Sequence, residues 1–220
     1  MLNQIDTDTT SLTSQTYQRI HSMIILGELV PGQKLKIEEL RKTLGTGASP
    51  VREALSLLTS EQLVERIDQR GFIVTQVSVE AFRELLKTRC WVEELALRES
   101  IKSANTEWEE QLILIHHRLK RAPRNTEAAD KEWEAQHKRF HLALLSGCGS
   151  SLLQKFCDQL YDQNIRYRNI ARPASAPKRD IGSEHDAILN HVLDKNADKA
   201  VSELVKHYTK TGEFLEKQIK

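Results

Sequence analysis

Two histidines, His137 and His141, stand four residues apart in the stretch EWEAQHKRFHLALLSGCGS, which runs from Glu132 to Ser150. In a helix this spacing puts both side chains on one face, one turn apart. The apolar residues on or near that face are Trp133, Phe140, Leu144 and Leu145. Imidazole nitrogens are good ligands for Zn, Ni, Cu or Fe. The role of two histidines on a face that should be buried therefore depends on which other segments meet them.

The composition is typical of a soluble, helix-rich protein with one large domain or two modest ones: 220 residues, 29% charged and 5% aromatic. The net charge of +1 does not by itself indicate nucleic-acid binding, so such a role needs local features. The three cysteines, Cys90, Cys148 and Cys157, lack any Cys-x-x-Cys spacing, which predicts a reduced, cytoplasmic protein. No apolar run approaches the roughly 18 residues of a membrane span. The polar residues 1–10 are expected to form a disordered arm.

Residues 11–77 change character quickly and predict a first domain. Helical spacing in TYQRIHSMIIL and KIEELRKTL predicts two short helices separated by the turn VPGQKL. A third helix starts in SPVREALSLLTSE, where Ser49 can cap it and Pro50 suits its first position. LVERI and FIVTQV alternate around the glycine-containing turn DQRG, which predicts a β-hairpin. Three short helices followed by a hairpin is the order of a winged helix-turn-helix.

Residues 78–220 carry no strand signal and predict a second, all-helical domain. The expected helices span about 78–102, 105–121, 127–146, 150–170, 178–194 and 197–217. Turn and capping residues separate them. Because the connections are short and the helices long and amphipathic, we expect an antiparallel six-helix bundle. The fold class is therefore mainly α, with an N-terminal winged helix-turn-helix and a C-terminal bundle.

The second helix of a helix-turn-helix enters the DNA major groove with its N-terminal residues leading. The residues expected to contact DNA there are Thr46, Gly47, Ala48, Ser49 and Arg52. At the hairpin tip, Arg70 and Gly71 can lie along the minor groove. Residues 1–76 hold eight Lys and Arg against nine Asp and Glu, so the domain is not basic overall. The alternative is that Arg52 and Glu53 simply form a solvated helix face.

The stretch SPVREALSLLTSEQLVERIDQRGFIV resembles the signature of the GntR family of bacterial regulators. The matching residues, in order, are Pro50, Val51, Arg52, Glu53, Ala54, Leu55, Leu63, Val64, Arg70, Gly71 and Val74. GELVPGQKL also resembles the family's link between its first two helices. Many members have Ser-Arg just before this stretch, where this chain has Gly47-Ala48. The resemblance thus implies DNA binding without that base-reading arginine.

The all-helical half resembles the ligand-sensing FCD domain of the FadR subfamily. RCWVEELALRESI is similar to its first helix, with Arg89 and Glu93 at the matching positions. HKRFHLALLSG, SEHDAIL and VSELVKHY resemble its histidine motifs, which makes His141, His185 and His207 expected ligands of a divalent metal, Zn with Ni as the alternative. His137 stands where the family has Asp and is a candidate fourth ligand. Alternatively, His137 only hydrogen-bonds a ligand or lines a metal-free pocket.

A metal with an open position beside arginines is a natural receptor for a carboxylate. Arg89 is the expected clamp, and Arg166 is a second candidate. Because Arg166 and Arg168 are two apart, at most one faces the cavity, and for either alone a surface position is the first expectation. The GCGS after the histidine helix resembles members associated with dicarboxylate catabolism. The resemblance implies a dimeric, ligand-responsive repressor released from operator DNA by a small carboxylate.

Two other functions fit parts of the sequence. A histidine-rich helical bundle suits a metallohydrolase, and His185-Asp186 is the pair that HD-type phosphohydrolases use. Against this, HKRFH lacks the Glu of the HExxH protease motif, no second acidic ligand is apparent, and the winged half would be unexplained. The remaining alternative is a DNA-binding protein whose histidines pack a ligand-free core. We therefore expect a regulator and not an enzyme.

Overall fold

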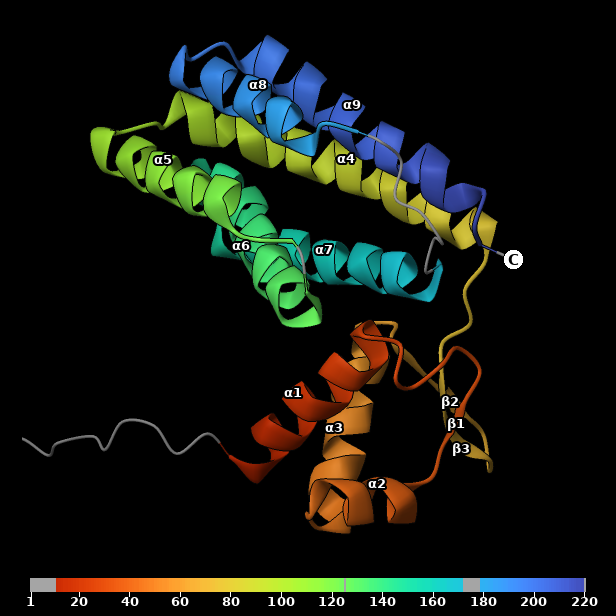
Figure 1. The fold of residues 1–220 in the computed structure, drawn as a ribbon. Coiled ribbons are helices and arrows are strands. Elements are labelled where there is room, and N and C mark those ends of the chain that lie inside the picture. The colour runs from red at the N-terminus through yellow and green to blue at the C-terminus, as the bar shows by residue number, and fades with distance from the viewer. Residues whose placement is uncertain (1–10, 125, 172–178, 220) are drawn as a thin grey trace, which may run out of the picture. The chain divides into compact units, whose positions relative to one another are not determined.

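The protein is described from a computed structural model that covers residues 11–124, 126–171 and 179–219 (Figure 1). The arm expected over residues 1–10 lies outside the described residues. The chain divides into two compact units, Met1–Val77 and Ser78–Lys220, and each is described here by itself. Within the described residues, none of the helices combines the length and apolar character that a membrane span requires.

From residue 11 onward, where its structure is described, the first unit consists of three helices and a small sheet. The helices are α1 (Leu12–Ile25), α2 (Ile37–Leu44) and α3 (Ala48–Ser60), and the strands are β1 (Lys34–Leu35), β2 (Val64–Ile67) and β3 (Gly71–Val74). β3 pairs antiparallel with both other strands, in the order β1-β3-β2. The expected hairpin is present, but β1 lies in a segment that was expected to be only a turn. Two residues are too few to show the alternation by which a strand is recognised in a sequence. β1 is a strand only because it pairs with β3.

α1 and α3 pack against each other to form the core of this unit. Ile20 and Ile24 of α1 and Leu55 and Leu58 of α3 are fully buried. The expectation that Ser49 caps α3 is wrong, because the helix begins at Ala48 and Gly47 takes the cap position in an extended conformation. Pro50 is therefore the third helical residue, where it is tolerated because the first-turn N–H groups have no partner within the helix.

A three-residue turn closes the hairpin between Ile67 and Gly71. The N–H of Arg70 donates to the carbonyl of Ile67 at 3.0 Å. Gln69 and Gly71 have φ values of 58° and 91°. The value at Gly71 is one that side chains rarely adopt, so glycine is required where the chain enters β3.

The described residues of the second unit form six α-helices and one short 3₁₀ turn. They are α4 (Val79–Lys102), α5 (Thr106–Arg121), α6 (Glu127–Leu145), η1 (Ser146–Cys148), α7 (Ser151–Ala171), α8 (Ile181–Leu193) and α9 (Ala197–Glu216). These bounds lie close to those expected from the sequence. α8 begins three residues late because the carboxylate of Asp180 accepts the N–H of Ser183 at 3.0 Å and caps it.

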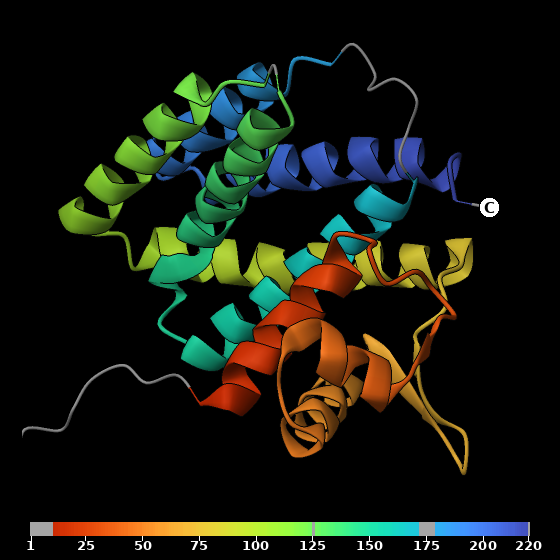
Figure 2. The ribbon, with the colours of Figure 1, turned by 60° about the horizontal axis from the view of Figure 1, so that its bottom comes forward.

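α9 packs against both α4 and α8, α4 also packs against α7, and α5 packs against α6. Figures 1 and 2 show α4 and α9 side by side, with the chain running in opposite directions along them. Gly212 of α9 permits this close approach, because a Cβ there would lie 2.3 Å from Cδ2 of Leu86 on α4. The apolar faces of the helices form one core, which includes the fully buried Phe140 and Leu144 of α6. The histidine-bearing face of α6 is therefore buried, as the periodicity predicted.

Candidate functional site

Four histidines from three helices meet inside the second unit: His137 and His141 of α6, His185 of α8 and His207 of α9. One nitrogen of each lies within 4.8 Å of the corresponding nitrogens of the other three. Their exposed fractions are 7%, 1%, 2% and 4%. Within the described residues, the structure thus brings together all four histidines that were expected to form a site.

Hydrogen bonds to the Nδ1 atoms orient two of these rings and define their tautomers. His207 Nδ1 lies 2.8 Å from the Glu184 carboxylate, which only accepts, and 3.1 Å from Arg179 Nη2, which only donates. The two hydrogens of Nη2 go to Glu184 and to the carbonyl of His207, so Nδ1 carries the proton and donates it to Glu184. The Tyr208 hydroxyl donates to Glu93 at 2.5 Å and therefore accepts from His141 Nδ1 at 2.9 Å. With Nδ1 protonated, His141 and His207 each have their lone pair on Nε2.

The other two rings complete a set of convergent nitrogens. His137 Nδ1 lies 2.7 Å from the Tyr161 hydroxyl, and His137 Nε2 lies 3.2 Å from His141 Nε2. His141 Nε2 bears a lone pair, so two arrangements fit this distance. Either His137 Nε2 donates its N–H to His141 Nε2, or both nitrogens bear lone pairs that would bind the same metal ion. His185 Nε2 is buried and has no hydrogen-bond partner among the described residues. A buried polar atom without a partner is costly, and a bound cation would satisfy it.

Burial keeps the imidazoles uncharged. Desolvation first, and then the neighbouring histidines and Arg89, hold the pKa values of His137 and His141 well below the usual range. The same loss of solvent lowers the pKa of His185 to about 2. Desolvation also lowers the pKa of His207, although Glu184 opposes this shift. The neutral imidazole is the form that binds metals.

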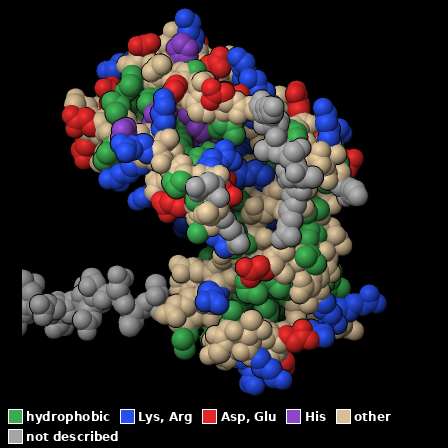
Figure 3. All heavy atoms as spheres, viewed as in Figure 1, with side chains coloured by type: hydrophobic (Ala, Val, Ile, Leu, Met, Phe, Trp, Pro, Cys, Tyr) green, Lys and Arg blue, Asp and Glu red, His purple; other side chains and the backbone are tan. Residues whose placement is uncertain are grey.

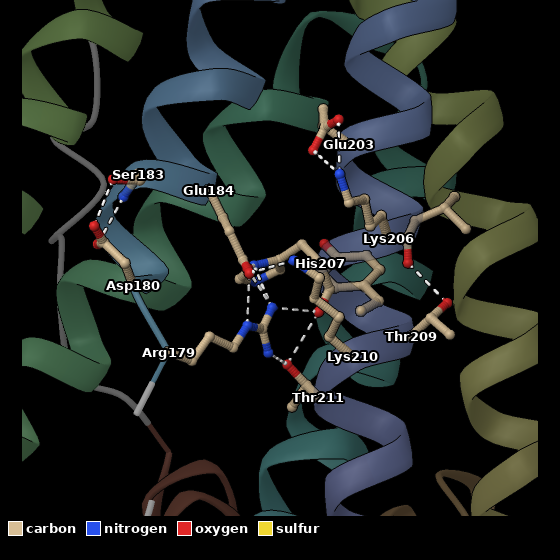
Figure 4. A network of polar contacts seen from close by, with 12 residues as sticks. Arg179, Asp180, Ser183, Glu184, Glu203, Lys206, His207, Thr209, Lys210 and Thr211 are labelled. Carbon is tan, nitrogen blue, oxygen red and sulfur yellow. Dashed lines mark hydrogen bonds and ion pairs between the residues drawn. The ribbon is translucent and has the colours of Figure 1, made fainter. Parts of the chain in front are cut away.

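Glu184 and Arg179 form a second layer around His207, which Figure 4 shows from close by. Arg179 Nε donates to Glu184 at 2.8 Å, and its Nη2 group pairs with the same carboxylate. Arg179 also donates to the carbonyl of His207 at 2.8 Å and to the hydroxyl of Thr211 at 2.7 Å. The sequence interpretation gave neither residue a role. Glu184 precedes His185 in the SEHDAIL motif, whereas Arg179 lies before α8 with no spacing signal.

Arg89 is buried, with an exposed fraction of 3%, and pairs with Glu93 at 2.5 Å. Its guanidinium carbon lies 4.0 Å from the ring centre of Tyr208 and 4.9 Å from that of Tyr161. Arg89 therefore connects to His141 through Glu93 and Tyr208. Its Nη2 group is buried without a hydrogen-bond partner among the described residues.

The two arginines of α7 differ from the expectation. Arg166 is buried, with an exposed fraction of 4%, so a surface position is wrong for this residue. Arg168 pairs with Glu134 of α6 and is partly exposed. Periodicity placed the two side chains in different directions, but it did not indicate which of them enters the core.

The residues expected to contact DNA lie at two places in the first unit. Gly47, Ser49 and Arg52 are exposed at the start of α3, while Thr46 is half-buried. Arg70 and Gly71 are exposed at the hairpin tip. The neighbouring Glu53 is not a purely solvated group, because its carboxylate accepts from the Thr13 hydroxyl of α1 at 2.8 Å.

A winged helix-turn-helix followed by a helical unit with a buried polar centre defines a class of transcriptional regulators with a separate sensor domain. Residues 12–74 match the family described as bacterial regulatory proteins, gntR family, and residues 84–210 match the FCD domain. The chain belongs to the GntR family and carries an FCD domain.

Two curated relatives and two solved structures are similar over most of their lengths. The uncharacterized HTH-type transcriptional regulator BphR of Paraburkholderia xenovorans is 36% identical over 90% of this chain and 82% of its own. The HTH-type transcriptional repressor GlaR of Escherichia coli is 30% identical over 89% of this chain and 91% of its own. The structure of E. coli McbR/YncC has a TM-score of 0.80 at 22% identity, and the match covers 96% of this chain and 99% of that one. A GntR regulator from Rhodococcus has a TM-score of 0.72 at 18% identity, covering 94% and 98%.

The proteins that the chain matches in sequence are transcriptional regulators, which are not enzymes. The metallohydrolase alternative is therefore set aside. Members of the GntR family bind DNA through the helix-turn-helix and an effector through the FCD domain.

Proposed function

We propose that this protein is a ligand-responsive repressor that binds operator DNA as a dimer and is released by a small carboxylate. In this proposal the carboxylate binds beside a divalent metal held by His137, His141, His185 and His207. The observation that carries it is the convergence of four uncharged imidazole nitrogens within 4.8 Å of one another. As a DNA-binding regulator it would work in the cytoplasm.

An all-imidazole set suits Zn, with Ni as the alternative. A bound divalent ion would supply positive charge and an open coordination position for a carboxylate oxygen. The chain's own second layer supports this assignment, because the Glu184 carboxylate accepts from His207 Nδ1. A carboxylate in this position commonly fixes the tautomer and orientation of a metal-binding histidine.

Arg89 is the proposed effector clamp. Its Nε is engaged by Glu93, and the rings of Tyr161 and Tyr208 hold the guanidinium in place. The unpartnered Nη2 group is thus a preorganised donor for an anion. Arg166 is buried in the same unit and remains the second candidate.

The DNA contacts are proposed for the start of α3 and the hairpin tip. Among the described residues, no carboxylate pairs with Arg52, whose exposed side chain can reach a phosphate or a guanine edge. Thr46, Gly47 and Ser49 would let the backbone approach a phosphate, and Arg70 and Gly71 would follow the minor groove. The name of the relative GlaR, a repressor, supports the sign of regulation.

Dimerisation is proposed for the face formed by α4 and α7, which pack against each other. Each of the two helices exposes a pair of large apolar side chains four residues apart, and therefore one turn apart on the helix. They are Trp91 (60%), Leu95 (54%), Leu152 (79%) and Phe156 (44%). A symmetric dimer would pair two winged domains with two operator half-sites. Effector binding would then favour a geometry of the helical domains that mis-spaces the winged domains.

The test is the metal content of the purified protein, compared with that of a His141→Ala/His185→Ala variant. Near-stoichiometric Zn or Ni in the wild type and its loss in the variant are expected. No metal in either protein, even after refilling, would favour the alternative of a DNA-binding protein with an unusually polar core. Arg89→Ala should retain operator binding but lose release by the effector, and unaltered release would refute the clamp.

A further inference from the structure

A chain of buried hydrogen bonds runs from α4 through α9 to the histidine cluster on α6. Arg89 Nε donates to one carboxylate oxygen of Glu93 at 2.5 Å, and the Tyr208 hydroxyl donates to the other at 2.5 Å. His141 Nδ1 lies 2.9 Å from the Tyr208 oxygen. All four residues have exposed fractions of 4% or less, whereas the charged side chains that Figure 3 shows on the outside of the second unit stand in solvent. The groups of this chain therefore have to find their partners inside the protein.

The direction of every bond in the chain follows from the guanidinium at its start. A guanidinium has only donors, so Glu93 accepts from Arg89, and the carboxylate of this ion pair has no proton to give. Tyr208 consequently uses its one proton on Glu93 and turns a lone pair toward His141. His141 must then donate from Nδ1, which leaves its lone pair on Nε2.

The opposite direction would suit the same ring positions equally well. If Tyr208 donated to His141 Nδ1, the proton of His141 would lie on Nε2 and point at His137 Nε2, which is 3.2 Å away. His137 could accept this proton and donate its own from Nδ1 to the Tyr161 oxygen at 2.7 Å. The positions of the rings therefore do not select the tautomer of His141, and the direction of the chain decides it.

We propose that Glu93 and Tyr208 are positioning residues that hold the proton of His141 on Nδ1, so that its Nε2 is free to bind a cation. Arg89 sets the direction of the chain, which gives it a second role besides that of effector clamp. The inference rests on the proposed function, because the cation is the divalent metal assigned to the histidine cluster. Glu184 plays the corresponding part for His207, but by a direct contact.

Tyr208→Phe tests the chain by removing one oxygen while keeping the ion pair of Arg89 and Glu93. His141 Nδ1 then loses its acceptor, whereas a proton on Nε2 still has an acceptor in His137. In the metal-free variant the proton should therefore move to Nε2, while in the wild type it lies on Nδ1. Nitrogen NMR of the full-length, histidine-labelled protein distinguishes the two tautomers, and the His141 signals are assigned by their absence from His141→Gln.

Tyr208→Phe should also bind Zn about tenfold to hundredfold more weakly in competition with a chelating dye, the usual cost of losing an outer partner of a metal-binding histidine. Tyr167→Phe is the matched control. It removes the hydroxyl of another buried tyrosine of the second unit, whose ring packs on Phe82 with 4.9 Å between the ring centres. It should leave both the tautomer of His141 and the Zn affinity as in the wild type.

Glu93→Gln should reverse the chain. The amide oxygen has to face the donor of Arg89, so the amide NH₂ group faces the Tyr208 oxygen, and the hydroxyl turns its proton toward His141. Both readouts should change as in Tyr208→Phe, and in the Tyr208→Phe background Glu93→Gln should have no further effect on Zn affinity. Because Glu93→Gln leaves a buried guanidinium without its counter-charge, circular dichroism first checks that it is folded. If it is not, Tyr208→Phe decides alone.

The outcomes separate this inference from the proposed metal site. If the proton of His141 occupies the same nitrogen in the wild type and in Tyr208→Phe, the chain does not set the tautomer and the inference is wrong, even where Zn binds. If the proton moves but the Zn affinity stays the same, the link between tautomer and metal binding is refuted. If the proton moves and neither protein binds Zn, the control of the proton is confirmed while the proposed metal site fails.

Discussion

Acidification of the metal-free protein should destabilise the helical unit more steeply than a typical protein of its size, because its core holds uncharged histidines. His185 has a pKa of about 2 in the folded protein, against about 6.5 when unfolded. Below pH 6.5 the unfolded chain therefore binds a proton that the folded protein excludes. The free energy of unfolding must fall as the pH falls through this window, and it is retained above it.

The magnitude follows from the size of the shift. A group that titrates only in the unfolded state changes the free energy of unfolding by about 1.4 kcal/mol per pH unit. His185 is 2% exposed, so solvent screening does not reduce this figure appreciably. The lowered pKa values of His137, His141 and His207 act in the same direction. Against a usual total of about 5–15 kcal/mol, the loss over two pH units is large.

Urea unfolding followed by tryptophan fluorescence measures this effect. Trp91, Trp108 and Trp133 all lie in Ser78–Lys220, so the signal reports the helical unit. Metal is first removed with a chelator. The free energy of unfolding is then determined at several pH values between about 7.5 and 5, because a histidine in the unfolded chain titrates in this range. His185→Gln should reduce the slope against pH, by about 1.4 kcal/mol per unit at the acid end of this range and by less near pH 7 (about half a unit above the unfolded pKa). His117→Gln, which alters an exposed histidine of α5, is the control.

A free energy of unfolding that stays constant from pH 7 to pH 5 (about one and a half units below the usual histidine pKa) would refute this reasoning. It would mean that the buried histidines accept protons in the folded state. An unchanged slope in His185→Gln would show that other groups are responsible for the pH dependence.

Three further changes test separate parts of the structure. Glu184→Gln removes the acceptor of His207 Nδ1 and should lower metal affinity about tenfold to hundredfold, measured by competition with a chelating dye. Gly212→Ala places a Cβ 2.3 Å from Leu86 Cδ2 and should cost about 1–2 kcal/mol in urea unfolding, after the gain in helix propensity; no loss would show that Leu86 moves freely. Leu58→Ala empties a fully buried position of α3 and should cost about 2–5 kcal/mol, seen by circular dichroism as earlier melting of the winged unit.

Much of the fold was predictable because its signals are local. The helices of the second unit end where turn and capping residues stand, and their apolar faces recur with the helical period. The same period placed His137 and His141 on the buried face of α6, where the structure has them. Errors occurred where a local signal was absent or ambiguous. β1 is only two residues long, and Ser49, whose side chain suits a cap position, lies inside the first turn of α3.

The sequence by itself determined that buried imidazoles occur on α6 and that a regulator's winged domain precedes them. Only the tertiary structure decided that four nitrogens converge, and which nitrogen of His141 and His207 faces inward. It also decided that Arg89 reaches His141 through Glu93 and Tyr208, and that Arg179 lies against His207. The reason is that helical periodicity specifies which face of a helix is buried, whereas the partners of that face depend on how the helices cross. These crossings are fixed by packing between segments far apart in the chain, as at Gly212 and Leu86.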